Sequence, residues 1–242
     1  MGARRSLFSV PVEPVRRLTG FAPRVGPVTG AVGAVIYAIS AFTAGSPLKP
    51  DASRQTVIDH FSDKRGAVLA GYLLAAVGVA LLVWFLGYLH KLVRNNEGAG
   101  GVLATITLAS WVSLLVIVVA GAVPLIAVVW RGAKQVSPGL VGLAFDASNL
   151  SLYSISATVA AVSVLAPIIV IWRSRCLTRW LVALGVVEIV VNGIEIAGIF
   201  ERSGFNAVGY VGGTGPFLWV LWVALLSIAM VLRPEAAEGI AA

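Results

Sequence analysis

The sequence predicts an all-α protein, a polytopic transmembrane bundle of about six helices with both termini in the cytoplasm. Two features of composition point to it, because 58% of the 242 residues are hydrophobic and only 12% are charged. Soluble domains average about half apolar and about a quarter charged residues. The third observation is that apolar runs recur along the chain, each near the roughly 20 residues that a helix needs to cross a bilayer.

Six apolar segments are expected to cross the membrane. The third and fourth exceed the length that a bilayer requires, which predicts tilt or a protruding end. The predicted domain organisation is a basic cytoplasmic tail over residues 1–26, a transmembrane domain over 27–232 and a disordered tail over 233–242. The six expected spans are Pro27–Ala44, Gly66–Leu89, Val102–Val129, Leu143–Trp172, Trp180–Phe200 and Phe217–Leu232.

The distribution of Lys and Arg sets the expected orientation. With both ends inside, eleven of these residues fall on the cytoplasmic side and seven on the outer side, as the positive-inside rule favours. This bias also accounts for the net charge of +7. Nucleic acid is not expected as a partner, because no basic helix carries aromatic stacking residues. The expected location is the plasma membrane.

The longest expected loop, residues 45–65, carries a short amphipathic helix. Ser53 can cap a helix that continues through Ser62 and gathers apolar side chains on one side. Such a helix would lie on the membrane surface or cover the end of the bundle. The side chains on its apolar side are Val57, Ile58 and Phe61.

Two further patterns concern packing between helices. Small residues recur every three or four positions and predict close helix contacts, whereas the seven tryptophans lie mostly near span ends and are expected to anchor the chain at the membrane interfaces. The small residues are Gly30 and Ala34 on the first span and Ala67, Gly71, Ala75 and Gly78 on the second.

An acidic stripe on the fifth span is the strongest functional signal. Glu188, Asn192 and Glu195 follow one another at helical spacing, with Gly185 one turn earlier, so they share one face. A carboxylate at membrane depth is costly, so this face is expected to point into the bundle and to mark a functional site. A carboxyl group held away from water favours its neutral form, which can donate a proton.

A second polar stripe is expected on the fourth span. Asp146, Asn149, Tyr153 and Ser156 follow the same spacing, and a short loop makes the fourth and fifth spans antiparallel neighbours. The stripes are then expected to meet in a polar pocket open to the outer face. Glu195 would lie near Tyr153 or Asn149, and Glu188 near Ser156 or Ser163. The candidate acids are Glu188, Glu195 and Asp146, and the candidate ligand-binding residues are Asn192, Asn149, Tyr153 and Ser156.

Neither a metal nor a cofactor is expected. Cys176 is the single cysteine, and the two histidines, His60 and His90, fall on opposite sides of the membrane in this topology. Neither a nucleotide-binding motif nor a hydrolase triad appears. The expected partners are membrane lipid, a lipophilic small molecule and a further membrane protein.

Four short segments resemble uncharacterised six-helix integral membrane proteins of high-GC Gram-positive bacteria. The resemblance implies a six-helix bundle in the plasma membrane and no particular activity. The pair Glu188 and Glu195 departs from it. The segments are His60–Gly66, Phe145–Asn149, Leu177–Trp180 and Gly215–Trp219.

Three functions are compatible with these residues. The first is a binding or transport-like protein whose intramembrane carboxylates handle a proton or a lipophilic small molecule. The second is an intramembrane enzyme that uses an acid on a lipophilic substrate, such as an isoprenoid-type cyclase. The third is an accessory subunit in which the polar residues only hold helices together. The sequence leaves open whether the protein is an enzyme.

Overall fold

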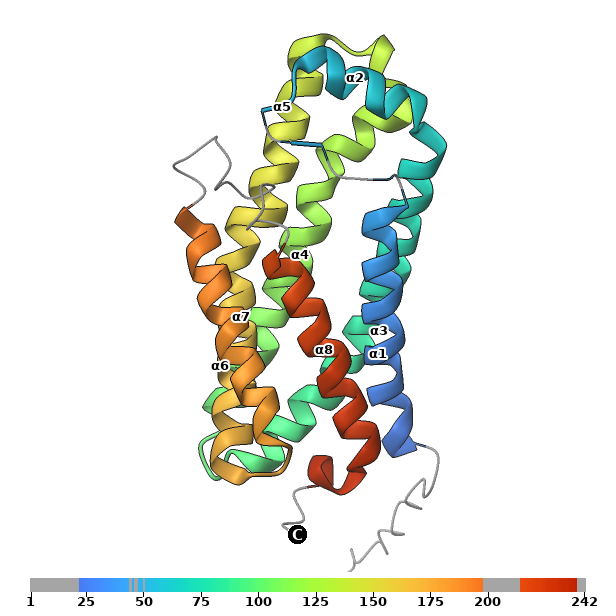
Figure 1. Ribbon diagram of the computed structural model, residues 1–242. Coiled ribbons are helices and arrows are strands. Elements are labelled where there is room, and N and C mark those ends of the chain that lie inside the picture. Colours follow the sequence, from blue (N-terminus) through green and yellow to red (C-terminus); the bar gives the residue numbers. More distant parts are fainter. Residues whose placement is uncertain (1–21, 44, 46–47, 50, 198–213, 239–242) are drawn as a thin grey trace, which may run out of the picture.

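The computed structural model describes residues 22–43, 45, 48–49, 51–197 and 214–238, and every regular element in these ranges is helical. Figure 1 shows a bundle of long upright helices with the short helix α2 laid across one end. In chain order the elements are α1 (Ala22–Phe42), α2 (Arg54–Asp63), α3 (Arg65–Asn96), α4 (Val102–Arg131), η1 (Ala133–Gln135), α5 (Pro138–Asn149), η2 (Leu150–Ile155), α6 (Ser156–Ser174), α7 (Arg179–Ala197), α8 (Thr214–Leu232) and η4 (Pro234–Glu238).

Five helices in the described part of the chain are long and apolar enough to cross a membrane. They are α1, α3, α4, the continuous α5–η2–α6 segment and α8. Their outer faces carry bare apolar side chains, such as Leu73 at 68% and Val116 at 59% exposure. Lipid rather than water suits such a surface, as expected for a multi-pass membrane protein. The expected fifth span corresponds to α7 and ends at Phe200, outside the described residues, so the count of six stays a prediction.

The described ends of the chain lie at the same end of the bundle. In Figure 1, α1 begins and α8 ends at the end opposite α2. The position of both termini in the cytoplasm stays a prediction. The expected N-terminal tail falls mostly on residues 1–21, outside the described ranges, and helix α1 already includes residues 22–26.

Helices α1 and α3 pack closely through small residues, as predicted. A side chain on Gly33 would lie 3.0 Å from the main-chain oxygen of Gly78, and a side chain on Gly78 would lie 3.0 Å from that of Gly33. Gly71 approaches the carbonyl of Ser40 in the same way. Absence of side-chain bulk therefore lets these two backbones touch.

A cluster of three tryptophans forms the centre of the bundle, which corrects the expected interfacial position for these three, whereas Trp84, Trp130, Trp172 and Trp180 are exposed. Trp111 and Trp222 are fully buried and Trp219 nearly so, and the rings of Trp111 and Trp219 lie 5.0 Å apart. Each buried indole N–H has an acceptor, as buried tryptophans require. The acceptors are the Ser163 carbonyl for Trp111, the Ser163 hydroxyl for Trp219 and the Leu181 carbonyl for Trp222.

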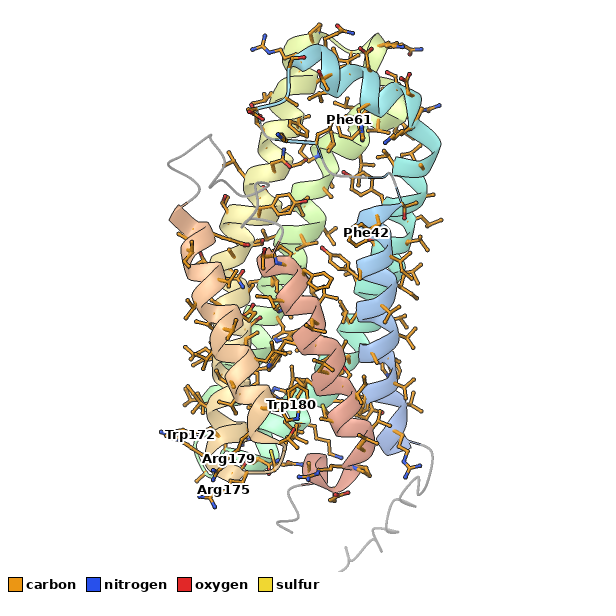
Figure 2. All side chains as sticks on the ribbon, in the orientation of Figure 1. Phe42, Phe61, Trp172, Arg175, Arg179 and Trp180 are labelled. Carbon is orange, nitrogen blue, oxygen red and sulfur yellow. The ribbon has the colours of Figure 1, made fainter. Side chains whose placement is uncertain are left out.

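Helix α2 is the amphipathic helix predicted for the long loop. The Ser53 hydroxyl accepts a hydrogen bond of 3.1 Å from the main-chain N–H of Thr56, which caps the helix as expected. Its apolar side chains Val57, Ile58 and Phe61 are buried against α5 and the upper part of α4. In Figure 2, Phe61 lies beneath α2 and Phe42 at the adjacent end of α1. Helix α2 therefore covers the end of the bundle.

The C-terminal segment is more ordered than the sequence suggested. Residues 233–242 were expected to be disordered, but Pro234–Glu238 form the 3₁₀ helix η4. Ala236 is buried, and its carbonyl accepts a 2.7 Å hydrogen bond from the Asn96 side chain at the end of α3. This contact satisfies a buried carbonyl and fixes η4 to the bundle.

Candidate functional site

The acidic stripe of α7 faces the interior, as predicted. Glu188, Asn192 and Glu195 are all at most 1% exposed, whereas Val190 and Ile194 on the other side of the helix are about half exposed. Helical spacing alone produces this division, because positions three or four apart share a face. The aliphatic side of α7 therefore faces outward, and the carboxyl groups are held inside the protein.

Glu188 is paired with Asn192 one turn later. The Asn192 side-chain amide donates to the Glu188 carboxyl oxygen Oε1 at 2.8 Å and to the Glu188 main-chain carbonyl at 2.9 Å. The second carboxyl oxygen, Oε2, is buried without a hydrogen-bond partner. Such a half-satisfied group is uncommon in protein interiors and often marks a functional role.

Glu195 binds the beginning of α8. Its carboxyl oxygen Oε1 accepts a 2.7 Å hydrogen bond from the main-chain N–H of Gly215, the second residue of that helix. The first N–H groups of a helix lack internal partners and attract negative charge, so the carboxyl group suits this place. A side chain on Gly215 would overlap the Glu195 carboxyl group. Glu195 thus joins α7 to α8.

The residues of the second polar stripe, predicted on the fourth span, do not all lie where they were expected. Asp146 is exposed and lines neither cavity, which removes it from the candidate acids. The predicted pairing of Glu188 with Ser156 or Ser163 is not found among the described residues. The Ser156 hydroxyl donates to the Leu152 carbonyl, and the Ser163 hydroxyl donates to the Ala160 carbonyl. Both hydroxyl groups thus donate to carbonyls of their own helical segment, and the Ser163 hydroxyl also accepts from the Trp219 indole.

A large cavity lies elsewhere than the pocket predicted between the fourth and fifth spans. It has a volume of about 510 Å³ and is enclosed by α1, α3, α4, the α5–η2 segment and the start of α8, with α2 above it. Cavities of about 300–1,000 Å³ hold typical small ligands. Asn149 and Tyr153 line it, as their assignment as ligand-binding residues requires, whereas Glu188 and Glu195 do not.

A smaller cavity of about 40 Å³ lies next to the large one. Tyr37, Leu152 and Pro216 line both cavities, while the predicted residues Asn192 and Ser156 line only the smaller. Since Asn192 also holds Glu188, the smaller cavity lies between the large cavity and the acidic stripe. Glu195 interacts electrostatically with Tyr153, which gives the stripe a second link to the large cavity.

Most residues around the large cavity could not be recognised from the sequence. Tyr37 and Tyr72 come from helices on which no functional residue was expected, and His60 and Phe61 reach it from α2. The one signal present was the row of small residues on α3, which was interpreted as packing only. Ala75, in that row, lines the cavity.

A π-helical turn shapes one wall of the cavity. The helix widens at η2 (Leu150–Ile155) between α5 and α6, and Leu152 and Tyr153 from this turn line the cavity. Insertions of this kind occur frequently at functional sites. The hydroxyls of Ser148 and Ser154 and the Asn149 amide nitrogen are buried there without hydrogen-bond partners. The turn therefore departs from regular structure beside the cavity.

Comparison with protein-family models, with curated proteins and with solved structures finds no match to this chain. The resemblance to six-helix membrane proteins of Gram-positive bacteria therefore stays a prediction. Function has to be inferred from the two cavities and the side chains around them.

Proposed function

We propose that this chain is a multi-pass plasma-membrane protein that binds a lipophilic small molecule in the large cavity. In this proposal the chain crosses the membrane six times, with both termini in the cytoplasm and α2 on the outer side. The observation that carries the proposal is the cavity itself, about 510 Å³ in volume and walled mainly by Ala, Val, Leu and Phe side chains. A well-packed bundle leaves few voids of this size, so a ligand is the simplest occupant.

Access from the lipid supports a lipophilic ligand. Phe42 at the end of α1 and Phe217 at the start of α8 both line the cavity, and both are more than half exposed. They lie where the cavity reaches the apolar surface of the bundle. A molecule dissolved in the bilayer can therefore reach the cavity without passing through water.

Binding is better supported than acid catalysis. Neither Glu188 nor Glu195 lines the large cavity, so neither carboxyl group can reach a molecule held there without rearrangement. Glu195 is engaged with the start of α8. Glu188 and Glu195 each keep one buried carboxyl oxygen, Oε2, without a partner, so both are candidates for a proton-handling role beside the binding site.

A blocking substitution tests this proposal. Ala122 on α4 lines the cavity, and Ala120 on the same helix is exposed on the outer face. The probe is a hexadecane chain that bears a photoreactive diazirine and an alkyne tag, added to protein in lipid nanodiscs. We expect Ala122→Phe to lose labelling of cavity-lining peptides from α1 and α3, because the ring fills the cavity. Ala120→Phe, the matched control, should label as the unmodified protein does.

The opposite result is easily recognised. Labelling confined to outward-facing residues, or equal labelling of cavity peptides in both variants, would show that the probe only senses the surrounding lipid. Size-exclusion chromatography of both variants establishes that they are folded before the labelling is compared.

A further inference from the structure

Three tyrosine side chains from three different elements meet at the large cavity. Tyr37 comes from α1, Tyr72 from α3 and Tyr153 from the π-turn η2, and all three line it. Tyr37 and Tyr72 each interact electrostatically with Tyr153, so the hydroxyl groups lie in one neighbourhood. None of the three hydroxyls hydrogen-bonds to another residue within the described ranges. They form the polar part of an otherwise apolar enclosure.

A hydroxyl group without a partner costs most when it is fully buried. Tyr37, Tyr72 and Tyr153 are half-buried at the cavity wall, and their hydroxyls are not among the fully buried polar atoms. A hydroxyl in such a place gains a hydrogen bond when a bound molecule supplies the partner. The buried tryptophans of the same protein differ, since every buried indole N–H already has an acceptor. The tyrosine hydroxyls are therefore placed as if their partner arrives with a bound molecule.

The cavity offers no countercharge. Among the described residues that line it there is no Lys, Arg, Asp or Glu, and His60 is the one ionisable side chain besides the tyrosines. A charged group moved from water into such surroundings has no ion to pair with, which makes its transfer strongly unfavourable. A ligand that places a permanent charge inside the cavity is therefore disfavoured.

We propose that the cavity binds an uncharged amphipathic lipid, with an apolar body and one hydroxyl or carbonyl oxygen that hydrogen-bonds to Tyr37, Tyr72 and Tyr153. This inference rests on the proposed function and adds the chemical class of the ligand. A tyrosine hydroxyl can both donate and accept, so alcohols, ketones and esters all fit. The apolar body occupies the aliphatic remainder of the cavity and meets the lipid at Phe42 and Phe217.

Competition against the hexadecane photoprobe tests the head group. The competitors share one chain and differ only at its end: hexadecane, hexadecanol, methyl palmitate, hexadecanesulfonate and hexadecyltrimethylammonium. We expect hexadecanol and methyl palmitate to compete at about fivefold lower concentration than hexadecane, the effect of one net hydrogen bond. The two charged competitors should be weaker than hexadecane.

Removal of single hydroxyl groups tests the tyrosines. We expect Tyr153→Phe, Tyr37→Phe and Tyr72→Phe to reduce the advantage of hexadecanol over hexadecane by severalfold, while competition by hexadecane itself is unchanged. Tyr88→Phe is the matched control, because Tyr88 lies on α3 and lines neither cavity. Phenylalanine preserves the ring, so these variants keep the packing of the cavity wall.

Two failures are distinguishable. The first failure leaves ligand binding intact and overturns only the assignment of an uncharged polar head. It is seen if the cavity is labelled but hexadecane competes as well as hexadecanol, or if a charged competitor is the best. It is also seen if the Tyr→Phe variants keep the full preference for hexadecanol. If cavity peptides are not labelled by any probe, the binding function and the ligand class fail together.

Discussion

The two ends of the bundle differ in how completely side chains fill the space between the helices. In the packed half, around Trp111, Trp222 and Leu181, the large side chains are fully buried and interlock. In the cavity half, between α2 and the start of α8, a volume of about 510 Å³ is left open. Helices α3 and α4 run through both halves, so the difference comes from side chains rather than from the arrangement of helices.

Polar satisfaction differs between the halves in part, since Thr178 Oγ1 and Glu97 Oε1 at the packed end are also buried without hydrogen-bond partners. In the packed half the indole nitrogen of Trp222 donates to the Leu181 carbonyl at 3.0 Å. In the cavity half the buried Ser148 hydroxyl and Asn149 amide nitrogen have no hydrogen-bond partner. A stable core satisfies its polar groups internally, whereas a binding site leaves some of them for the ligand. The packed half therefore contributes most of the stability, whereas the open space and unpaired polar groups of the cavity half reduce it.

The largest expected effect is the loss of a tryptophan from the packed half. Trp222→Ala removes a fully buried ring and its hydrogen bond, so we expect a loss of about 3–5 kcal/mol of stability. Trp84→Ala is the control, because that side chain on α3 is 61% exposed to lipid. Thermal unfolding in nanodiscs measures both. Equal losses from the two variants would mean that the packed half is not the stabilising core.

The next largest expected effect is the loss of the hydrogen bond that connects α7 to α8. Glu195→Ala leaves the buried Gly215 N–H without its acceptor, and we expect a loss of about 1–3 kcal/mol, the usual cost of an unsatisfied buried donor. Glu195→Gln keeps the shape and an acceptor oxygen, so it should retain most of the stability. A glutamine variant as unstable as the alanine variant would show that the acid itself is required rather than an acceptor at this place.

A matched pair of serines compares the halves directly. Ser163 and Ser148 are both buried, but the Ser163 hydroxyl accepts from the Trp219 indole at 3.1 Å, while the Ser148 hydroxyl has no partner. We expect Ser163→Ala to lose about 1 kcal/mol or more, and Ser148→Ala to leave stability unchanged or to raise it. Chemical unfolding of the two variants side by side measures the sign. A loss at Ser148 would show that its hydroxyl is satisfied after all.

Much of the fold could be predicted because lipid imposes simple rules. Apolar length located the helices to within a few residues at most ends, and the Ser53 cap located α2. The burial of Glu188 and Glu195 also followed from the cost of a carboxylate in lipid. Three of the seven tryptophans, Trp111, Trp219 and Trp222, were placed wrongly, because the same residue suits both an interface and a core with hydrogen-bond acceptors. The acceptors at Ser163 and Leu181 appear only once the helices are packed.

The site could be predicted only in part. Asn149 and Tyr153, predicted because they share one face of a helix, line the cavity, and their role in binding a ligand stays a prediction. Tyr37 and Tyr72 were missed, because a single tyrosine on an apolar helix carries no periodic signal. Which helix faces which depends on close contacts such as Gly33 against Gly78, and these are not visible in one sequence. The cavity arises from that arrangement, so it could not be located beforehand.

The smallest expected effect concerns α2 above the cavity. The pKa of His60 is lowered from its ordinary value of 6.5, mainly by burial and further by Lys64, while Asp63 acts in the opposite direction. The unfolded segment therefore binds a proton more readily than the docked one, so docking of α2 is favoured above about pH 6.5 and weakens as the pH falls through the lowered pKa. We expect amides of α2 to exchange hydrogen slightly faster at pH 5.5 than at pH 7.5, after correction for intrinsic rates, while amides of α6 are unaffected. His60→Leu should abolish the difference. If the leucine variant keeps it, another group controls this end of the cavity half.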